Sequence, residues 1–423
     1  MAMPWDEATP DPVAAIAAAR AELGDTFQVH SGDADYLFVF GADAVRWFYA
    51  VDEAAASKGV ADWRMLLRKL PDELFLGRRT LPHELFGRDD VARYRTLLDG
   101  AIDGAIREID ELGGEAMLDA FSLTRRLGHR LGLASWGGTA FVRSPVFDQL
   151  VGLFDQLDAS DAFVRPDLVA AIAAVGKAEE RSSLADLVAL ISEIAAESTS
   201  ESTAGFRAIM ARWADVEPEA AVAGAAQDLI LVHLGSMSNL FAAIGWLLID
   251  LALRPDLAAS AMAESGLLER CALESTRLAQ RSIMMREVMA GAVEVPDGDR
   301  TYRVPRGATV ATLLPLTNRG SPDLERYRPE RWKGRRLADI SHLGARELVT
   351  TFGHGPHTCP AQPFSLYAMT EAVRRIFDRY AVTPQFTAVE PRRSQIGGVA
   401  RSEEAAVLRF DPAGSQSPHD RLT

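Results

Sequence analysis

The stretch 352–361 reads Phe-Gly-His-Gly-Pro-His-Thr-Cys-Pro-Ala and contains the most informative residue of the chain, Cys359. Its two glycines let the backbone turn tightly and approach a neighbouring group closely. The pattern predicts an amphipathic helix directly afterwards, over residues 362–380, whose first N–H groups point back at the sulfur and favour a thiolate. A thiolate on a glycine-rich loop is what a thiolate-ligated haem requires. The alternative is a buried structural cysteine, and this segment by itself leaves both readings open.

The composition is that of a soluble globular protein. Of 423 residues, 48% are hydrophobic and 25% are charged, which are ordinary values. No obvious linker divides the chain, so we expect one large domain over residues 1–423. The net charge of −14 argues against nucleic acid as the main partner. The two cysteines, Cys271 and Cys359, form no disulfide framework, which favours a reducing, cytoplasmic compartment.

Residues 229–253 form an apolar stretch long enough to cross a membrane. The middle of the stretch nevertheless holds a histidine, two serines and an asparagine. We interpret it as a helix that runs through the centre of a large soluble protein and is buried on all sides. Residues 1–12 are polar and proline-rich, without a basic start or an apolar run. No targeting sequence or membrane anchor is therefore expected.

The remaining patterns predict a mainly α protein with small β regions. Helices are expected over residues 11–23, most of 41–253, 268–280 and 362–380. A hairpin is expected over 26–40, strands over 301–304 and 309–314, and a last β region over 382–410 that turns at Gly397-Gly398. Residues 1–60, 300–320 and 382–410 would then form a β-rich part, and 60–290 and 340–381 a helical part. The Ser- and Pro-rich tail, 413–423, is expected to be disordered.

Two further segments acquire meaning together with the cysteine loop. One is Glu274-Ser275-Thr276-Arg277, whose first and last residues share a helix face. The other is Pro329-Glu330-Arg331-Trp332. In this order and at these separations the three segments resemble the cytochrome P450 superfamily, with its Glu-x-x-Arg, Pro-x-Arg-Phe-like and Phe-x-x-Gly-x-x-x-Cys-x-Gly motifs. The resemblance spans nearly the whole chain and implies the P450 fold, a triangular prism of helices around a buried haem b. One departure is Ala361, which stands where the family has glycine.

The resemblance assigns roles to several residues. Cys359 would be the axial ligand of the haem iron, and Phe352 and Gly355 would shape the haem loop. His357, Arg286 and Arg95 would bind the haem propionates, although a solvated helix face is an equal alternative for Arg95. Buried charges persist only when they are paired, so a structural ion network is expected to contain Glu274, Arg277 and Arg331.

The central helix departs from the family pattern. When the match is anchored on Trp246 and Arg254-Pro255, residues 235–240 lie over the iron. Ser238 then occupies the position of the family's acid and Asn239 that of its alcohol, so the usual proton-delivery pair is missing. We treat both as candidate catalytic residues. The alternative is that their polar groups only satisfy a helix kink near Gly235.

An asparagine at this position resembles the branch that contains bile-acid sterol hydroxylases and prostacyclin synthase, although this chain looks soluble and bacterial-type. The leading hypothesis is a haem-thiolate monooxygenase that hydroxylates a lipophilic small molecule with dioxygen and electrons from a ferredoxin-type donor. A peroxide-using enzyme (isomerase, dehydratase or peroxygenase) is the second hypothesis, and a non-catalytic haem-binding protein is the third. The predicted substrate pocket contains Ala242, Ala243, Ile283, Met284 and Gly398.

Overall fold

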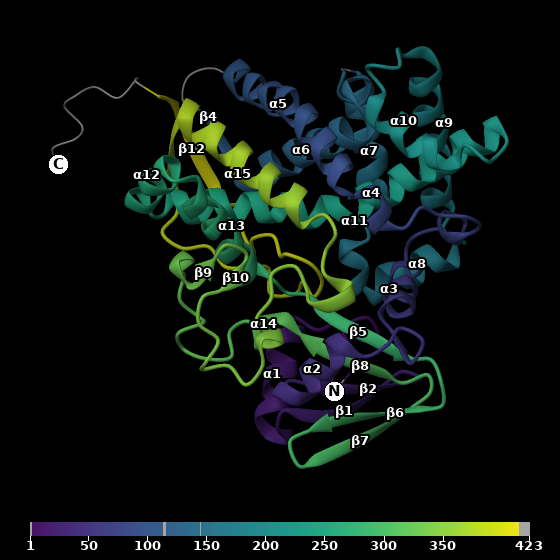
Figure 1. Cartoon of the computed structure of the whole chain (residues 1–423), viewed down its shortest axis with the longest axis vertical. Coiled ribbons are helices and arrows are strands. Elements are labelled where there is room, and N and C mark those ends of the chain that lie inside the picture. The colour runs from purple at the N-terminus through teal and green to yellow at the C-terminus, as the bar shows by residue number, and fades with distance from the viewer. Residues whose placement is uncertain (1, 113–115, 144, 414–423) are drawn as a thin grey trace.

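The computed structural model describes residues 2–112, 116–143 and 145–413. The chain is mainly helical with small sheets, as the sequence predicts (Figure 1). The α-helices are α1 (Pro12–Leu23), α2 (Ala42–Ala50), α3 (Lys58–Leu66), α4 (Pro82–Leu85), α5 (Arg88–Glu111), α6 (Ala120–Gly132), α7 (Val146–Leu157), α8 (Pro166–Ala174), α9 (Ala178–Glu197), α10 (Ala204–Met210), α11 (Pro218–Ala252), α12 (Pro255–Ala263), α13 (Ser265–Ala279), α14 (Leu314–Thr317) and α15 (Gln362–Arg379). Shorter 3-10 and π turns are η1 (Asp72–Phe75), η2 (Leu133–Gly137), η3 (Thr139–Val142), η4 (Ser160–Phe163), η5 (Ala211–Trp213), η6 (Pro329–Arg331), η7 (Arg346–Leu348) and η8 (Gly355–His357).

The strands form four separate sheets. They are β1 (Thr26–Ser31), β2 (Ala34–Val39), β3 (Ala56–Ser57), β4 (Ala116–Asp119), β5 (Ile283–Val288), β6 (Ala292–Asp297), β7 (Arg300–Pro305), β8 (Thr309–Leu313), β9 (Trp332–Lys333), β10 (Arg336–Leu337), β11 (Tyr380–Pro384) and β12 (Val407–Pro412). The largest sheet has the order β1-β2-β8-β5-β3 and lies at one end of the molecule together with α1 and α2, and most other helices lie above it in Figure 1.

The predicted hairpin is confirmed as β1 and β2. Phe27 pairs with Phe38 and Val29 with Tyr36, around a turn in which Gly32 has φ +57°. Since side chains alternate between the two faces of a strand, these four residues join one hydrophobic cluster while Leu37 and Val39 join another. This sheet carries β5, the strand that later supplies one wall of the site.

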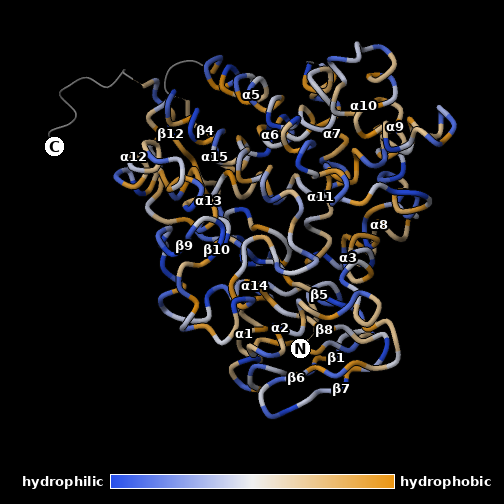
Figure 2. The backbone as a smooth tube through the Cα atoms, viewed as in Figure 1, coloured by the Kyte–Doolittle hydropathy of each residue, from blue (hydrophilic) through white to orange (hydrophobic). Residues whose placement is uncertain are grey.

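The central helix is α11, which begins at Pro218, well before the predicted start at residue 229. It packs against α6, α9, α10, α13 and α15. Within the described residues it is the one helix long and apolar enough to cross a membrane, but 67% of its most apolar window is buried. Surface helices such as α5 instead alternate apolar and polar residues along their length (Figure 2). The burial of α11 is therefore that of a core helix.

A buried polar chain fixes the side of α11 that faces α6 and α7. Trp136 Nε1 donates to His233 Nδ1 at 3.1 Å, His233 Nε2 lies 2.9 Å from His129 Nδ1, and His129 Nε2 lies 3.0 Å from Asp155 Oδ1. Because Trp136 can only donate, one arrangement satisfies the chain, with both histidines neutral and each donating through Nε2. Burial lowers the pKa of both histidines, and that of His233 most strongly.

The predicted division into β-rich and helical parts needs two corrections. First, strands β4 and β5 lie inside the range 60–290 that was expected to be helical. Second, the C-terminal strands β11 and β12 pair with β4 in a sheet of their own, away from the N-terminal strands. A four-residue strand such as β4 pairs with a partner almost 300 positions away along the chain, so no local pattern announces it. Of the predicted disordered tail, residues 414–423 lie outside the described residues.

Candidate active site

The loop before Cys359 is held in a conformation that requires its glycines. Gly353 has φ +79° and Gly355 has φ +62°. A Cβ on Gly353 would lie 2.9 Å from the carbonyl oxygen of His357, and one on Gly355 would lie 2.8 Å from that of Tyr49. The Cys359 N–H donates to the carbonyl of Phe352 at 2.7 Å and closes the loop. The thiol is thereby presented on a rigid turn.

The start of α15 faces the sulfur, as the sequence predicts. Burial raises the pKa of the Cys359 thiol, while the backbone N–H groups of Ala361 and Gln362 and the charge of Lys58 act in the opposite direction. These donors stabilise a thiolate. Ala361 has φ −80° and ψ 0°, a backbone conformation open to any residue, so alanine fits where the resembled family has glycine.

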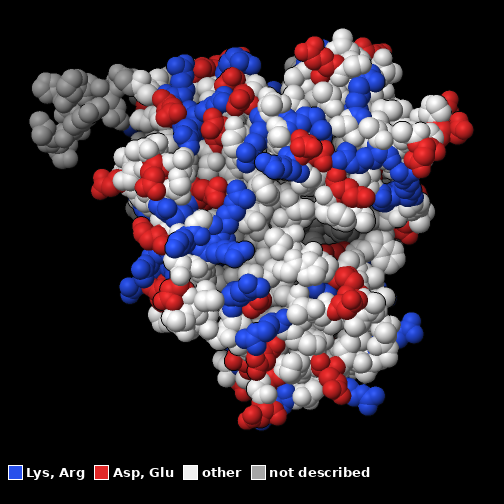
Figure 3. All heavy atoms as spheres, viewed as in Figure 1, with Lys and Arg blue, Asp and Glu red and all other residues white. Residues whose placement is uncertain are grey.

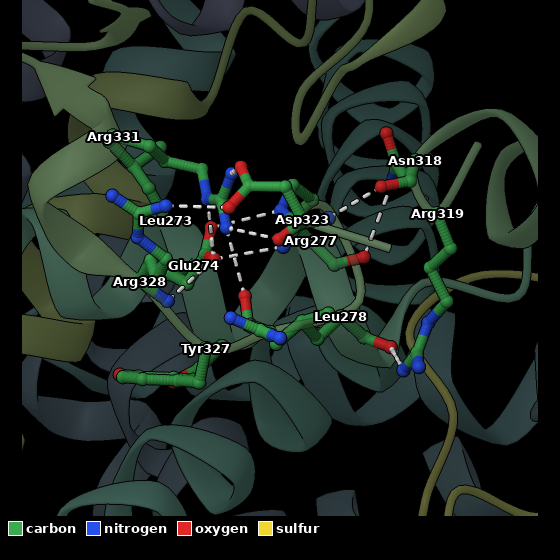
Figure 4. A network of polar contacts seen from close by, with 12 residues as sticks. Leu273, Glu274, Arg277, Leu278, Asn318, Arg319, Asp323, Tyr327, Arg328 and Arg331 are labelled. Carbon is green, nitrogen blue, oxygen red and sulfur yellow. Dashed lines mark hydrogen bonds and ion pairs between the residues drawn. The ribbon is translucent and has the colours of Figure 1, made fainter. Parts of the chain in front are cut away.

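The predicted ion network forms around Glu274, whose carboxylate is fully buried (Figure 4). Glu274 accepts from Arg277 Nη2 and Nε at 2.8 and 2.9 Å and from Arg331 Nε at 2.8 Å. The backbone N–H of Arg328 and the Trp332 indole complete five hydrogen bonds to the two oxygens. Arg277 also donates to the carbonyl of Asn318. The network joins α13 to the segment around η6, and Asn318 links it to the start of the cysteine loop through two hydrogen bonds with the backbone of Thr350.

A cavity of about 410 Å³ joins Cys359 to α11. Most of its lining is apolar, and no Asp or Glu lines it within the described part of the chain. The lining from α11 is Leu231, Val232, Gly235, Ser236, Asn239, Leu240 and Ala243; that from the cysteine loop includes Phe352, Gly353, His357, Cys359 and Ala361; and Lys58, Phe86, Thr276, Gln280, Ser282, Met284 and Val399 add to the walls. A larger hollow of about 560 Å³, around Arg281 and Arg319, is more polar and contains no cysteine.

Asn239 faces the cavity, but its carbonyl oxygen is already engaged. Asn239 Oδ1 accepts a hydrogen bond from the backbone N–H of Val399 at 2.8 Å. Gly398, with φ +65°, brings this turn so close that a Cβ would lie 2.4 Å from the same oxygen. The structure therefore gives Asn239 a structural role in tying α11 to the turn, and its NH₂ group and one lone pair of Oδ1 remain.

Ser238 lies elsewhere, which corrects the expected Ser238–Asn239 pair over the iron. Its hydroxyl donates to Asp158 Oδ1 at 3.2 Å and does not line the cavity. The α11 residues on the cavity recur every three to four positions, at 231–232, 235–236, 239–240 and 243, and this helix face does not include position 238. The hydroxyl that α11 does present to the cavity is that of Ser236, three residues before Asn239. An i, i+3 pattern read from Asn239 would have found it.

The other predicted pocket residues also divide. Met284 and Ala243 line the cavity, whereas Ala242 lines a separate hollow beside Phe121. Ile283 packs into the core cluster under the largest sheet. The alternation of β5 explains this, since neighbours on a strand face opposite sides. Gly398 does not line the cavity and instead lies against Asn239.

One edge of the site gathers cations around a carboxylate that the sequence did not single out. Arg286 Nη1 donates to Glu53 Oε1 at 2.9 Å, and His357 Nε2 lies 2.5 Å from the same oxygen. Although burial acts against it, the N–H groups of Lys58 and Gly59 and the hydroxyl of Ser57 lower the pKa of Glu53 to about 2. Burial lowers the pKa of His357, and Arg286 adds to this.

Arg95 is not brought to the cavity. Its guanidinium lies 4.6 Å above the ring of Tyr367, a cation–π contact between α5 and α15. Its Nε is buried and has no hydrogen-bond partner among the described residues. Gly355 likewise shapes the loop from outside the cavity lining.

The arrangement fits a haem. A thiol stands on one side, and Gly235 on the other side leaves open space, because a Cβ there would meet nothing within 4 Å. His357 Nε2, on the cavity lining, has only its unaligned contact with Glu53, and Arg286 Nε, beyond that lining, is buried without a hydrogen-bond partner in the described part. Such orphaned N–H groups are costly unless they bind an acceptor, and haem carboxylates are acceptors of the right kind.

Comparison with known proteins points the same way. No protein-family model matches the chain. A curated relative, "Cytochrome P450 monooxygenase apf7" of Gibberella fujikuroi (strain CBS 195.34 / IMI 58289 / NRRL A-6831), is 27% identical over 148 residues, which are 34% of this chain and 27% of that protein. The match supports the cytochrome P450 superfamily. A relative of this superfamily implies a haem cofactor but does not specify the type of haem. The matched region spans about a quarter of the relative's length.

Proposed function

We propose that this protein is a haem-thiolate monooxygenase of the P450 fold that hydroxylates a lipophilic small molecule, such as a sterol, a lipid or a natural-product intermediate. The cavity that joins Cys359 to the open face of α11 at Gly235 is the observation that carries the proposal. Haem b, when bound, supplies the chemistry of dioxygen activation. The protein's own residues bind the haem, orient the substrate and exclude water.

The residue roles follow from their places. Cys359 Sγ would hold the haem iron, and Arg286 and His357 would hold the haem carboxylates. Arg95 is a third proposed partner of the haem carboxylates. To reach them, its side chain would have to leave the ring of Tyr367. Leu231, Val232, Leu240 and Met284 give the cavity its apolar character, which favours a lipophilic substrate.

Proton supply is the step for which the chain departs most from the resembled family. Because Val399 already occupies one lone pair of Asn239 Oδ1, the NH₂ group is the main part of the amide left for a water in the cavity. Ser236 Oγ lies 3.2 Å from the carbonyl of His233 and donates to it, which leaves its lone pairs free to accept. We propose that Ser236 and Asn239, rather than Ser238 and Asn239, order a cavity water.

A peroxide-using enzyme is the second candidate. The absence of any Asp or Glu from the described cavity lining favours it, since a peroxide substrate brings its own O–O bond and needs no delivered protons. This reaction also occurs in the branch that Asn239 resembles. Asn239→Thr separates the two candidates, because a gain in coupled oxygenation with dioxygen would count against the peroxide enzyme.

Partners and location are proposed on simpler grounds. A ferredoxin-type donor would approach near Cys359. Side chains of both signs are interspersed over the face shown in Figure 3, without a single-sign field, which fits the proposal that nucleic acid is not a partner. Cys271 and Cys359 are both free, which supports a reducing, cytoplasmic compartment.

The test begins with spectra of the haem-reconstituted protein. We expect the reduced, CO-bound form to show the thiolate signature and Cys359→Ser to lose it while remaining folded. Substrate-induced spin-state shifts across sterols, fatty acids and polyketides then identify the ligand class. Product formed from dioxygen and an electron donor supports the monooxygenase. If a hydroperoxide is converted quickly and no donor supports turnover, the monooxygenase proposal is wrong.

A further inference from the structure

Glu53 occupies a built carboxylate site. Its Oε1 accepts from the Lys58 N–H at 3.0 Å and from Arg286 Nη1 at 2.9 Å, and lies 2.5 Å from His357 Nε2. Its Oε2 accepts from Ser57 Oγ at 2.8 Å and from the Gly59 N–H at 3.3 Å. We call this set of donors the carboxylate site; its members are Ser57, Lys58 N–H, Gly59 N–H, Arg286 and His357.

The donors are fixed, whereas the carboxylate is on a turn. Arg286 is 1% exposed and also donates to the carbonyl of Ala56 at 2.7 Å, which ties its guanidinium to the largest sheet. Glu53 is 42% exposed and lies in the turn between α2 and β3. A partly exposed side chain on a turn can leave such a site more easily than a guanidinium in the core can follow it.

Glu53 does not satisfy the site fully. Arg286 Nε and His357 Nε2 have no hydrogen-bond partner among the described residues, even though Glu53 lies 2.5 Å from the latter nitrogen. The two atoms lie in close contact without hydrogen-bond alignment. A carboxylate arriving from the cavity side could satisfy donors that Glu53 reaches poorly.

The carboxylate site opens toward the cysteine. His357 and Lys58 both line the cavity that contains Cys359, and His357 precedes Cys359 by two residues. On the proposed function, the haem brings carboxylates to this edge. Like charges a few ångströms apart repel each other, so the Glu53 carboxylate and a haem carboxylate disfavour binding to Arg286 at the same time.

We propose that Glu53 is an internal competitor for haem. Its carboxylate and a haem carboxylate contend for Arg286 and His357, so haem binding displaces Glu53 toward solvent. The inference rests on the proposed function and assigns to Glu53 a role in haem affinity, not in turnover.

The test is haem affinity and haem release in Glu53→Gln, which keeps the shape and removes the charge. We expect on the order of tenfold tighter haem binding, the effect of removing one like charge about 4 Å away in a partly hydrated site, and a correspondingly slower transfer of haem to an acceptor apoprotein. The matched control is Glu73→Gln, which removes the same charge from an exposed pair with Arg181 and should leave both quantities unchanged.

A second readout separates competition from simple support. Glu53 stabilises the haem-free protein through Arg286, so Glu53→Gln should lower the urea midpoint of the haem-free form more than that of the haem-loaded form. Unchanged or weaker haem binding in Glu53→Gln overturns the inference and makes Glu53 a positioning residue for Arg286. If the wild type itself binds no haem with the thiolate signature, the proposed function fails instead.

Discussion

Removing the charge of Glu274 should destabilise the protein more than any other single loss of a surface or core charge pair discussed above. In Glu274→Gln the amide NH₂ best occupies the Oε2 position, where it faces two donors, Arg277 Nε and the Trp332 indole. Two hydrogen bonds to a carboxylate are lost, each contributing about 1.5–3 kcal/mol. Arg277 is fully buried and loses its counter-charge, whereas Arg331, 8% exposed, keeps its ion pair with Asp323 at 3.1 Å. We expect a loss of about 3–5 kcal/mol in the free energy of unfolding.

The measurement is urea-induced unfolding at fixed haem loading. The control is Glu269→Gln, which removes a carboxylate from the half-exposed pair with Arg335 and should cost about 0–1 kcal/mol. Arg277→Met in the Glu274→Gln background should recover part of the loss, because it removes the buried cation that Glu274 had compensated. Equal midpoints for Glu274→Gln and Glu269→Gln would refute the reasoning.

Two other outcomes are expected. Burial lowers the pKa of both His129 and His233, so the two neutral side chains take up protons only when the protein unfolds. The free energy of unfolding should therefore be at its full value above pH ~6.5 and fall as the pH drops below it. The loss should reach up to about 1.4 kcal/mol per pH unit for each histidine. His233→Gln should flatten this dependence in urea titrations at pH 5.5 and 7.5, and parallel losses in both proteins would contradict the assignment. Gly398→Ala should lower the free energy of unfolding by about 1–3 kcal/mol. It should also weaken substrate binding in spin-state titrations, because the new methyl group pushes Asn239. Gly291→Ala, at φ +55° with open space around it, should lower only the free energy of unfolding. Equal titrations for these two variants would argue against the contact.

Parts of the site were predictable because their signal is local. The glycines of the cysteine loop have backbone angles that other residues adopt only with strain, and the spacing of Glu274 and Arg277 on one helix face is a property of the helix itself. The buried network formed as predicted, and the N–H groups at the start of α15 face Cys359 as expected.

Other parts were missed because they depend on rotation about an element axis. An error of one or two positions along α11 changes which hydroxyl faces the cavity, and so Ser236 replaces Ser238 beside Asn239. The same applies on β5, where Met284 faces the cavity and its neighbour Ile283 faces the core. Sequence patterns identify such a helix or strand reliably. Which of its side chains face the cavity depends on the residues used to anchor the match to the family.

The sequence by itself determined the cysteine loop, the buried ion network and the buried central helix, because glycine conformation, helical spacing and hydrophobic runs are encoded within short stretches. Only the tertiary structure decided what meets these elements. Glu53 reaches Arg286 across more than 200 residues, and Val399 takes the oxygen of Asn239 across 160. Contacts between such distant segments arise from packing of whole elements, and no local pattern contains them.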